Sequence, residues 1–183
     1  MSRIRYLITD SSFYSSHPIR FKTRLLRAVR RHDPTFILYR EKERFSRSMA
    51  LWLRRRFGQR VLLHSHIDLA RRFRFFGVHL PSDRLLSIPL AKRAGLFVVV
   101  STHTIEEILL AKRLGADMAT FSPIFATPGK GRPKGIKLLR KTIRRSRFPI
   151  IALGGIVGKR QIDSTLRTKA AGFASIRYFA HLL

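Results

Sequence analysis

Two adjacent glycines, Gly154 and Gly155, follow the apolar run 150–153 and precede a helical pattern that begins near Gln161. Glycines at such a turn let backbone N–H groups approach an anion closely, and the start of the helix adds a favourable dipole. A tight turn without a ligand would use the same two residues. The pattern therefore predicts a phosphate-binding turn, with a purely structural turn as the alternative.

Cations and hydroxyls gather in two other segments. Arg40 and Lys42 bracket Glu41 after the apolar run 36–39, and alternation along an extended chain places both cations on one side. The segment 127–131 combines glycine, proline, a threonine hydroxyl and a lysine. Such a loop has the mobility and the charge to close over a phosphorylated substrate, and a solvated connection is the alternative.

Four histidines fall near the ends of apolar runs: His64, His66, His79 and His103. Histidine is the commonest metal ligand in proteins. A zinc site usually adds cysteine or acidic ligands, yet the chain has no cysteine and few acids. The pattern therefore favours histidines that are hydrogen-bonded locally over a zinc site.

The composition is that of a folded, strongly basic domain. The chain has 183 residues, 45% of them hydrophobic, which is enough for one domain over residues 1–183 and excludes a disordered basic tail. It carries 38 Lys and Arg against 10 Asp and Glu, a formal net charge of +28. Such a field attracts phosphorylated small molecules, nucleic acid or acidic membrane surfaces. Because the cations interleave with apolar residues, we expect most of them on solvated helix faces, with non-specific RNA association as a secondary expectation.

The start of the chain predicts where the protein works. Only the short apolar run 6–8 precedes Asp10, whereas an export signal needs about 7–15 apolar residues. No stretch approaches the ~20 apolar residues that span a bilayer. The absence of cysteine excludes disulfides and thiolate metal sites, and it is compatible with a reducing compartment. We therefore expect no membrane association and a cytoplasmic location.

Short apolar runs alternate with segments of helical spacing along the whole chain. Thr104 and Glu107, for example, have the spacing of a capping box at the start of a helix that ends near Gly115. The expected strands are 3–8, 36–39, 61–64, 77–80, 96–101, 118–121, 150–153 and 172–176.

This alternation predicts a (β/α)8 TIM-type barrel. The chain is shorter than the ~250 residues typical of such barrels. Segment 67–76 is barely long enough for a helix, and 178–183 is too short for a full eighth helix. We therefore expect a compact barrel with trimmed third and eighth helices, with an open doubly wound sheet as the alternative. The strand ends that would meet at the barrel mouth are rich in cations, hydroxyls and glycines, which predicts an anion pocket.

Six short motifs, taken in order, resemble one family. They are Tyr39-Arg40-Glu41-Lys42, Gly77-Val78-His79-Leu80, Ser101-Thr102-His103-Thr104, Leu114-Gly115-Ala116-Asp117, the run from Ser122 to Lys130, and Ala152-Leu153-Gly154-Gly155-Ile156. Each motif is weak alone, but together they are similar to the thiamine phosphate synthase family, which includes the thiazole tautomerases. The resemblance is clearest from Ile37 to Ile176 and independently implies a barrel.

The resemblance implies an enzyme of thiamine biosynthesis. Hydroxymethylpyrimidine diphosphate loses pyrophosphate, and the nitrogen of thiazole phosphate captures the pyrimidine cation, normally with Mg²⁺ on the leaving group. By resemblance, the residues that hold pyrophosphate are Arg40, Lys42, Ser101 and Lys130. Those that hold thiazole phosphate are Thr127, Gly154, Gly155 and the backbone near Ile176.

Several positions depart from the family pattern. His64-Ser65 stands where the family has an Asn-Asp pair that holds substrate and magnesium, so a carboxylate is missing and Asp83 is left as the candidate metal ligand. His64 nevertheless occupies a substrate-binding position. So do Gly129 and Arg177, which replace a hydroxyl residue and a small or hydroxylic residue.

These departures leave other functions open. One is a catalytically degenerate homologue that binds phosphate or thiazole phosphate, as a sensor or regulator. Another is a thiazole tautomerase, although the tautomerases of the family place a histidine where this chain has Pro123. RNA association through the net charge is the third alternative, and the residues do not predict an oligomeric state.

Overall fold

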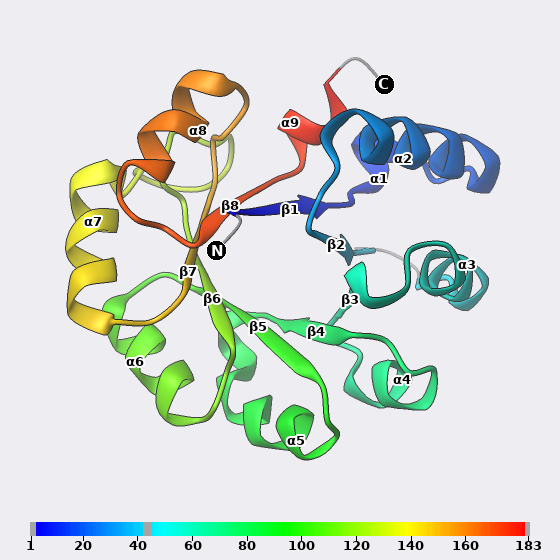
Figure 1. Ribbon diagram of the computed structural model, residues 1–183, viewed down its shortest axis with the longest axis horizontal. Coiled ribbons are helices and arrows are strands. Elements are labelled where there is room, and N and C mark those ends of the chain that lie inside the picture. Colours follow the sequence, from blue (N-terminus) through cyan, green and yellow to red (C-terminus); the bar gives the residue numbers. More distant parts are fainter. Residues whose placement is uncertain (1–2, 42–44, 182–183) are drawn as a thin grey trace.

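The computed structural model describes residues 3–41 and 45–181 (Figure 1). In this part of the chain, parallel strands close into a barrel in sequence order, and the last strand pairs with the first. The strands are β1 (Ile4–Ile8), β2 (Phe36–Tyr39), β3 (Val61–His64), β4 (Gly77–Leu80), β5 (Phe97–Thr102), β6 (Met118–Phe121), β7 (Ile150–Leu153) and β8 (Gly172–Ser175). The predicted (β/α)8 barrel is confirmed, and the open sheet is wrong.

Helices surround the barrel as an outer ring (Figure 1). They are α1 (Ser11–Tyr14), α2 (Pro18–His32), α3 (Arg47–Phe57), α4 (Ile67–Arg72), α5 (Ile88–Arg93), α6 (Ile105–Arg113), α7 (Gly135–Ser146), α8 (Lys159–Leu166) and α9 (Arg177–Ala180), with 3-10 turns η1 (Gly58–Arg60) and η2 (Ser82–Ser87). The third and eighth crossovers are trimmed as expected, because α4 has 6 residues and α9 has 4. Within residues 3–41 and 45–181, no helix combines the length and apolar character needed to cross a bilayer.

Some element boundaries differ from those predicted. Strand β5 runs one residue later than expected, because the N–H of Leu96 bonds to the carbonyl of Ala91 at the exit of α5. Strand β8 ends before Ile176, whose backbone already has helical dihedral angles at the start of α9. Helix α8 begins at Lys159, two residues before the expected start.

Alternation along each strand divides the core into two layers. One set of strand side chains faces the helices, as Val78 and Val98 do, and the other set fills the barrel interior, as Leu62 and Val99 do. All four are fully buried. The predicted capping box at the start of α6 also forms. The Thr104 hydroxyl accepts the N–H of Glu107 at 3.1 Å.

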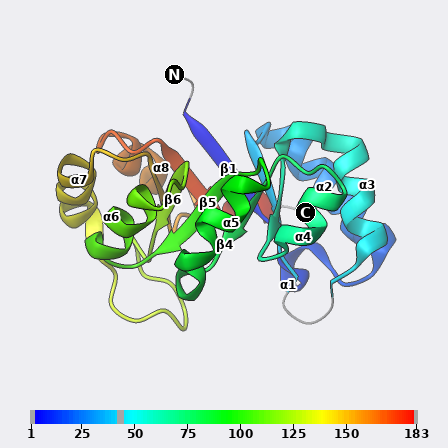
Figure 2. The same cartoon turned by 90° about the horizontal axis from the view of Figure 1, so that it is seen from below.

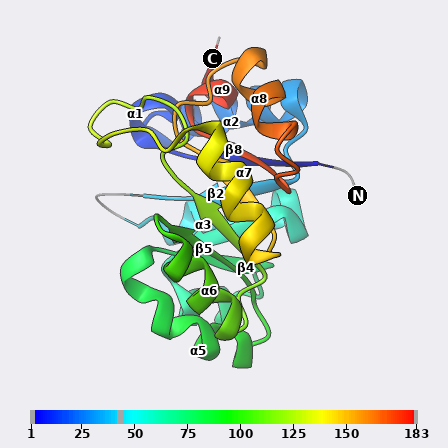
Figure 3. The ribbon, with the colours of Figure 1, turned by 90° about the vertical axis from the view of Figure 1, so that its left-hand side faces the viewer.

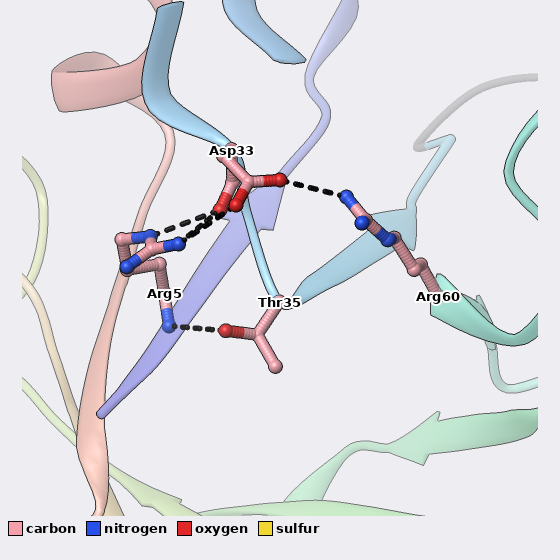
Figure 4. Close-up of polar contacts among 4 residues, drawn as sticks. All are labelled: Arg5, Asp33, Thr35 and Arg60. Carbon is pink, nitrogen blue, oxygen red and sulfur yellow. Dashed lines mark hydrogen bonds and ion pairs between the residues drawn. The ribbon is translucent and has the colours of Figure 1, made fainter. Parts of the chain in front are cut away.

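A polar cluster ties the elements together at the N-terminal end of the barrel (Figure 4). Asp33 ends α2 with a left-handed backbone, and its carboxylate accepts hydrogen bonds from Arg5 at 3.1 Å and Arg60 at 2.9 Å. The Thr35 hydroxyl accepts the backbone N–H of Arg5 at 3.2 Å. These contacts stabilise the end of the molecule opposite to the predicted mouth, and so leave the other end for chemistry.

Candidate functional site

The C-terminal ends of the strands form the mouth of the barrel. Figure 2 shows the first residues of β1 at one end of the molecule and the long yellow-green connection from β6 to α7 projecting from the other. A cavity of about 390 Å³ lies at this mouth. It brings together seven of the residues predicted from the sequence, which are Arg40, Thr127, Lys130, Gly154, Gly155, Ile176 and Arg177.

The glycine turn lies directly against the β6–α7 loop. Gly154 and Gly155 have φ angles of 98° and 68°. A Cβ on Gly154 would lie 2.8 Å from Pro123 Cα, and one on Gly155 would lie 2.6 Å from the Ala126 carbonyl oxygen. The glycines are therefore required for this close packing, and the same contact brings the Thr127 hydroxyl to within 3.2 Å of the Gly154 Cβ position.

A tight turn places Lys130 at the cavity. The N–H of Lys130 bonds to the carbonyl of Thr127 at 3.2 Å, and Gly129 has a φ of 69°, which is the arrangement of a type II turn with Pro128 at its second position. Gly129 is not one of the described residues that line the cavity. Its role in substrate binding stays a prediction, and its left-handed backbone shapes the loop.

Arg40 is held by Asp10, a residue that the sequence motifs do not single out. The Arg40 Nη2 lies 3.0 Å from Asp10 Oδ2, and Asp10 is only 4% exposed. The other carboxylate oxygen accepts the N–H of Ser12 and so caps α1. The position of Asp10 at the end of the first apolar run was the available signal. Lys42, the predicted partner of Arg40, lies outside the described residues.

Two other predicted residues, Ser101 and His64, lie outside the lining of this cavity. His64 and His79, the partner of Ser101, are both close enough to Arg40 for its charge to lower their pKa values. Ser101 Oγ is 2.8 Å from His79 Nε2, and His64 Nδ1 is 3.2 Å from the Ser65 hydroxyl. Burial, with a smaller contribution from the Arg40 charge, lowers the pKa of His64 to about 4. These histidines therefore have local polar partners and are neutral at pH 7.

The described donors do not fit the magnesium site that the resemblance implies. Mg²⁺ binds through carboxylates, water and substrate phosphates in octahedral geometry. Asp83 is an exposed carboxylate on η2, and Ser65 contributes a hydroxyl where a carboxylate was expected. Across residues 3–41 and 45–181, no three His, Asp or Glu side chains come together to hold a metal.

Comparison with known proteins places the chain in a family. The profile of the family described as thiamine monophosphate synthase matches residues 5–179. Thiamine-phosphate synthase from Chloroflexus aurantiacus is 32% identical over 182 residues, which cover 93% of this chain and 82% of that protein. A relative from Geobacter sulfurreducens is 35% identical over 126 residues, 66% of this chain and 59% of the relative, so that match spans less than two thirds of the relative's length.

A solved structure gives the same result at the level of the fold. Thiamine phosphate pyrophosphorylase from Pyrococcus furiosus superposes with a TM-score of 0.78 at 25% identity, over 94% of this chain and 85% of that one. The family profile, the relatives and this structure agree with the six motifs. The chain belongs to the thiamine monophosphate synthase family.

Proposed function

We propose that the protein is a transferase that makes thiamine phosphate from hydroxymethylpyrimidine diphosphate and thiazole phosphate, with release of pyrophosphate. Family membership over residues 5–179 supports the reaction. The observation that carries the proposal for the site is the convergence of the Arg40–Asp10 pair, Lys130 and the Gly154-Gly155 turn on one cavity. Cations and a glycine turn at one mouth suit two phosphorylated substrates.

The cavity divides between the two anions. Thiazole phosphate would lie at the glycine turn, where Thr127 and the backbone near Ile176 supply neutral donors and Arg177 adds a charge. The diphosphate would lie toward Arg40 and Lys130. In this assignment Ser101 and His64 belong to the diphosphate end.

The described side chains suit the electrostatic part of the reaction. When the bond between the pyrimidine methylene carbon and the diphosphate oxygen breaks, negative charge grows on the leaving group, and the thiazole nitrogen forms the new bond to that carbon. A guanidinium held in place by Asp10 stabilises this charge without reorganisation. Because the described carboxylates do not form a metal site, we assign charge stabilisation by the protein to Arg40 and Lys130.

The proposal is tested by incubating the purified protein with both substrates over a series of Mg²⁺ concentrations and measuring thiamine phosphate. We expect product, and we expect Lys130→Ala to lower its rate. A folded protein that binds thiazole phosphate yet makes no product would instead be the catalytically degenerate binding homologue.

A second activity, non-specific RNA association, is favoured by one surface. Helix α7 lies on the outside of the barrel, facing the viewer in Figure 3. One of its grooves, about 470 Å³ in volume, is lined by the exposed side chains of Lys137, Arg140, Lys141, Arg144 and Arg145. We propose that this cationic stripe binds RNA phosphates.

We also propose that residues 1–183 act as one domain and that the protein works in the cytoplasm.

A further inference from the structure

A chain of polar side chains runs through the barrel interior toward the mouth. The Tyr6 hydroxyl on β1 lies 3.0 Å from His79 Nδ1 on β4, and His79 Nε2 lies 2.8 Å from Ser101 Oγ on β5. Tyr6 is fully buried and His79 is 2% exposed, whereas Ser101 is half-buried. Ser101 lies near the C-terminal end of β5, two residues after the interior residue Val99. The chain of hydrogen bonds therefore leads from the buried core to the mouth of the barrel.

Burial fixes the direction of these hydrogen bonds. Tyr6 has a proton to donate, and among the described residues its hydroxyl bonds only to His79. A buried O–H without an acceptor is costly, so Tyr6 donates to His79 Nδ1. Desolvation raises the pKa of Tyr6, and burial lowers the pKa of His79 to about 3, so the tyrosine keeps its proton and the imidazole is neutral. A neutral imidazole that accepts at Nδ1 carries its proton on Nε2.

This polarity determines what Ser101 can offer to a ligand. Because His79 Nε2–H donates to Ser101 Oγ, the serine has no need to donate its own proton to the histidine. No second described side chain accepts that proton. The hydroxyl is thus free to donate to an anion at the mouth. With the opposite polarity, Ser101 would donate to His79 and would present only lone pairs to the anion.

We propose that Tyr6 and His79 are positioning residues that keep the Ser101 hydroxyl as a hydrogen-bond donor to the pyrophosphate end of the substrate. The assignment rests on the proposed function for its ligand. It is consistent with the location of Arg40, which is near enough to His79 to help lower the pKa of that histidine. Tyr6 and His79 themselves do not touch the substrate in this assignment.

The substitution Tyr6→Phe tests the proposal, because it removes the first donor and keeps the ring in the core. We expect the dissociation constant of inorganic pyrophosphate, measured by calorimetry with Mg²⁺ present, to rise about three- to tenfold, and that of thiazole phosphate to stay within about twofold. Tyr14→Phe is the matched control, since Tyr14 is also a fully buried tyrosine but its hydroxyl has no partner among the described residues.

Two further measurements separate positioning from packing. Tyr6→Phe should have no further effect on pyrophosphate affinity in the Ser101→Ala background, whereas a packing effect would add. Nitrogen NMR of His79, assigned by the loss of its signals in His79→Gln, should show the Nε2-protonated tautomer in the wild type and a mixture in Tyr6→Phe.

These outcomes distinguish the positioning role of Tyr6 and His79 from the proposed transferase reaction. Equal pyrophosphate affinity in the wild type and Tyr6→Phe, or an Nδ1-protonated wild type, would overturn the positioning role and leave the proposed reaction intact. A wild-type protein that binds no pyrophosphate would overturn both the positioning role and the diphosphate end of the proposed function.

Discussion

Arg40 is oriented before any ligand arrives. Its side chain bonds to the buried Asp10, and its backbone N–H donates to the Thr9 hydroxyl at 3.0 Å. A planar guanidinium held in this way can present its remaining donors to two phosphate oxygens at once. The position of Arg40 therefore combines charge with geometry, which an exposed arginine elsewhere on the surface does not.

Arg40→Ala is expected to weaken pyrophosphate binding about ten- to a hundredfold, because it removes a charge-assisted contact worth about 1.5–3 kcal/mol. Calorimetry at moderate salt measures the change. Arg55→Ala is the control, since Arg55 is exposed on α3 and its substitution removes the same formal charge. Equal small losses in both variants would mean that pyrophosphate responds only to the diffuse field of the protein.

Ser65→Asp is expected to increase the rate of thiamine phosphate formation at limiting Mg²⁺ by about tenfold or more, since the new carboxylate, together with Asp83, would supply the pair of oxygen ligands that the described residues lack. The backbone suits the change, because Ser65 has a φ of 64° and aspartate tolerates this conformation. Rates across a Mg²⁺ titration measure the effect. Ser65→Asn keeps the shape without the charge, and an equal gain in that variant would rule out the metal explanation.

The lowered pKa values of the buried His79 and the half-buried His64 make stability depend on pH. Burial lowers the pKa of His64 to about 4 and that of His79 to about 3, below the value near 6.5 of the unfolded chain. The unfolded state therefore binds more protons, and stability that is present above about pH 6.5 is lost as the pH falls toward 4. We expect the free energy of unfolding in urea to decrease from pH 7 to pH 5.5, by at most about 1.4 kcal/mol per pH unit for each histidine.

His64→Gln isolates one of these contributions. The variant should show a shallower dependence of the free energy of unfolding on pH over the same range, because one group that titrates only in the unfolded state is gone. An unchanged slope would show that His64 is already solvated and titrates normally in the folded protein.

At the scale of elements, the site depends on the contact between the β7–α8 turn and the β6–α7 loop. Gly154 allows this contact, and the Phe125 N–H bonds to the Gly154 carbonyl at 3.0 Å. The loop is thereby fixed at its base while Lys130 stays exposed near its tip. The anion site is thus built from two connections that hold each other in place.

Gly154→Ala should displace the loop, because its Cβ would lie 2.8 Å from Pro123 Cα at a φ of 98°. We expect the dissociation constant of thiazole phosphate to rise at least tenfold by calorimetry, and stability to fall by more than the roughly 1–2 kcal/mol of backbone strain. Gly95→Ala has a similar φ of 74° and open space around its Cβ. Gly95→Ala should lower the free energy of unfolding in urea by the backbone strain alone and leave the affinity for thiazole phosphate unchanged. An equal loss of affinity in both variants would refute the role of the contact between Gly154 and the β6–α7 loop.

Elements were predictable from the sequence where their signals are local. Strands such as 36–39 and 150–153 match the structure, because apolar β-branched runs between turn signals need no knowledge of distant residues. The pairs that position side chains were not predictable, since Asp10 and Arg40 are 30 residues apart and Tyr6 and His79 are 73 apart. Only barrel closure and strand register bring such residues together. The backbone conformation of Gly129 was not predictable either, because its positive φ depends on the turn that residues 127–130 adopt.

At the scale of the whole molecule, the net charge of +28 predicts salt-dependent RNA association. Binding should fall steeply as salt rises and show little sequence preference, because phosphate neutralisation releases counterions. Arg140→Ala with Arg144→Ala on α7 should reduce the slope of log affinity against log salt by about 1.4 for single-stranded RNA. Fluorescence anisotropy with labelled RNA measures the slope.

The matched control removes two exposed arginines from another helix, Arg55 and Arg56 of α3. If both double variants reduce the slope equally, the α7 stripe has no special role and the whole surface contributes. Affinity that is independent of salt would contradict phosphate neutralisation altogether.

The pairing of β1 with β8 has a consequence for synthesis on the ribosome. Ile4 lies in register with Gly172, so the barrel closes only after nearly the whole chain has been made. Until then β1 and the newest strand each expose an unpaired edge, which invites pairing with other nascent chains. The mutual repulsion of chains that carry a large excess of positive charge opposes this encounter. The same cations that decorate the finished surface would therefore act as an intrinsic protection against aggregation while the barrel is still open.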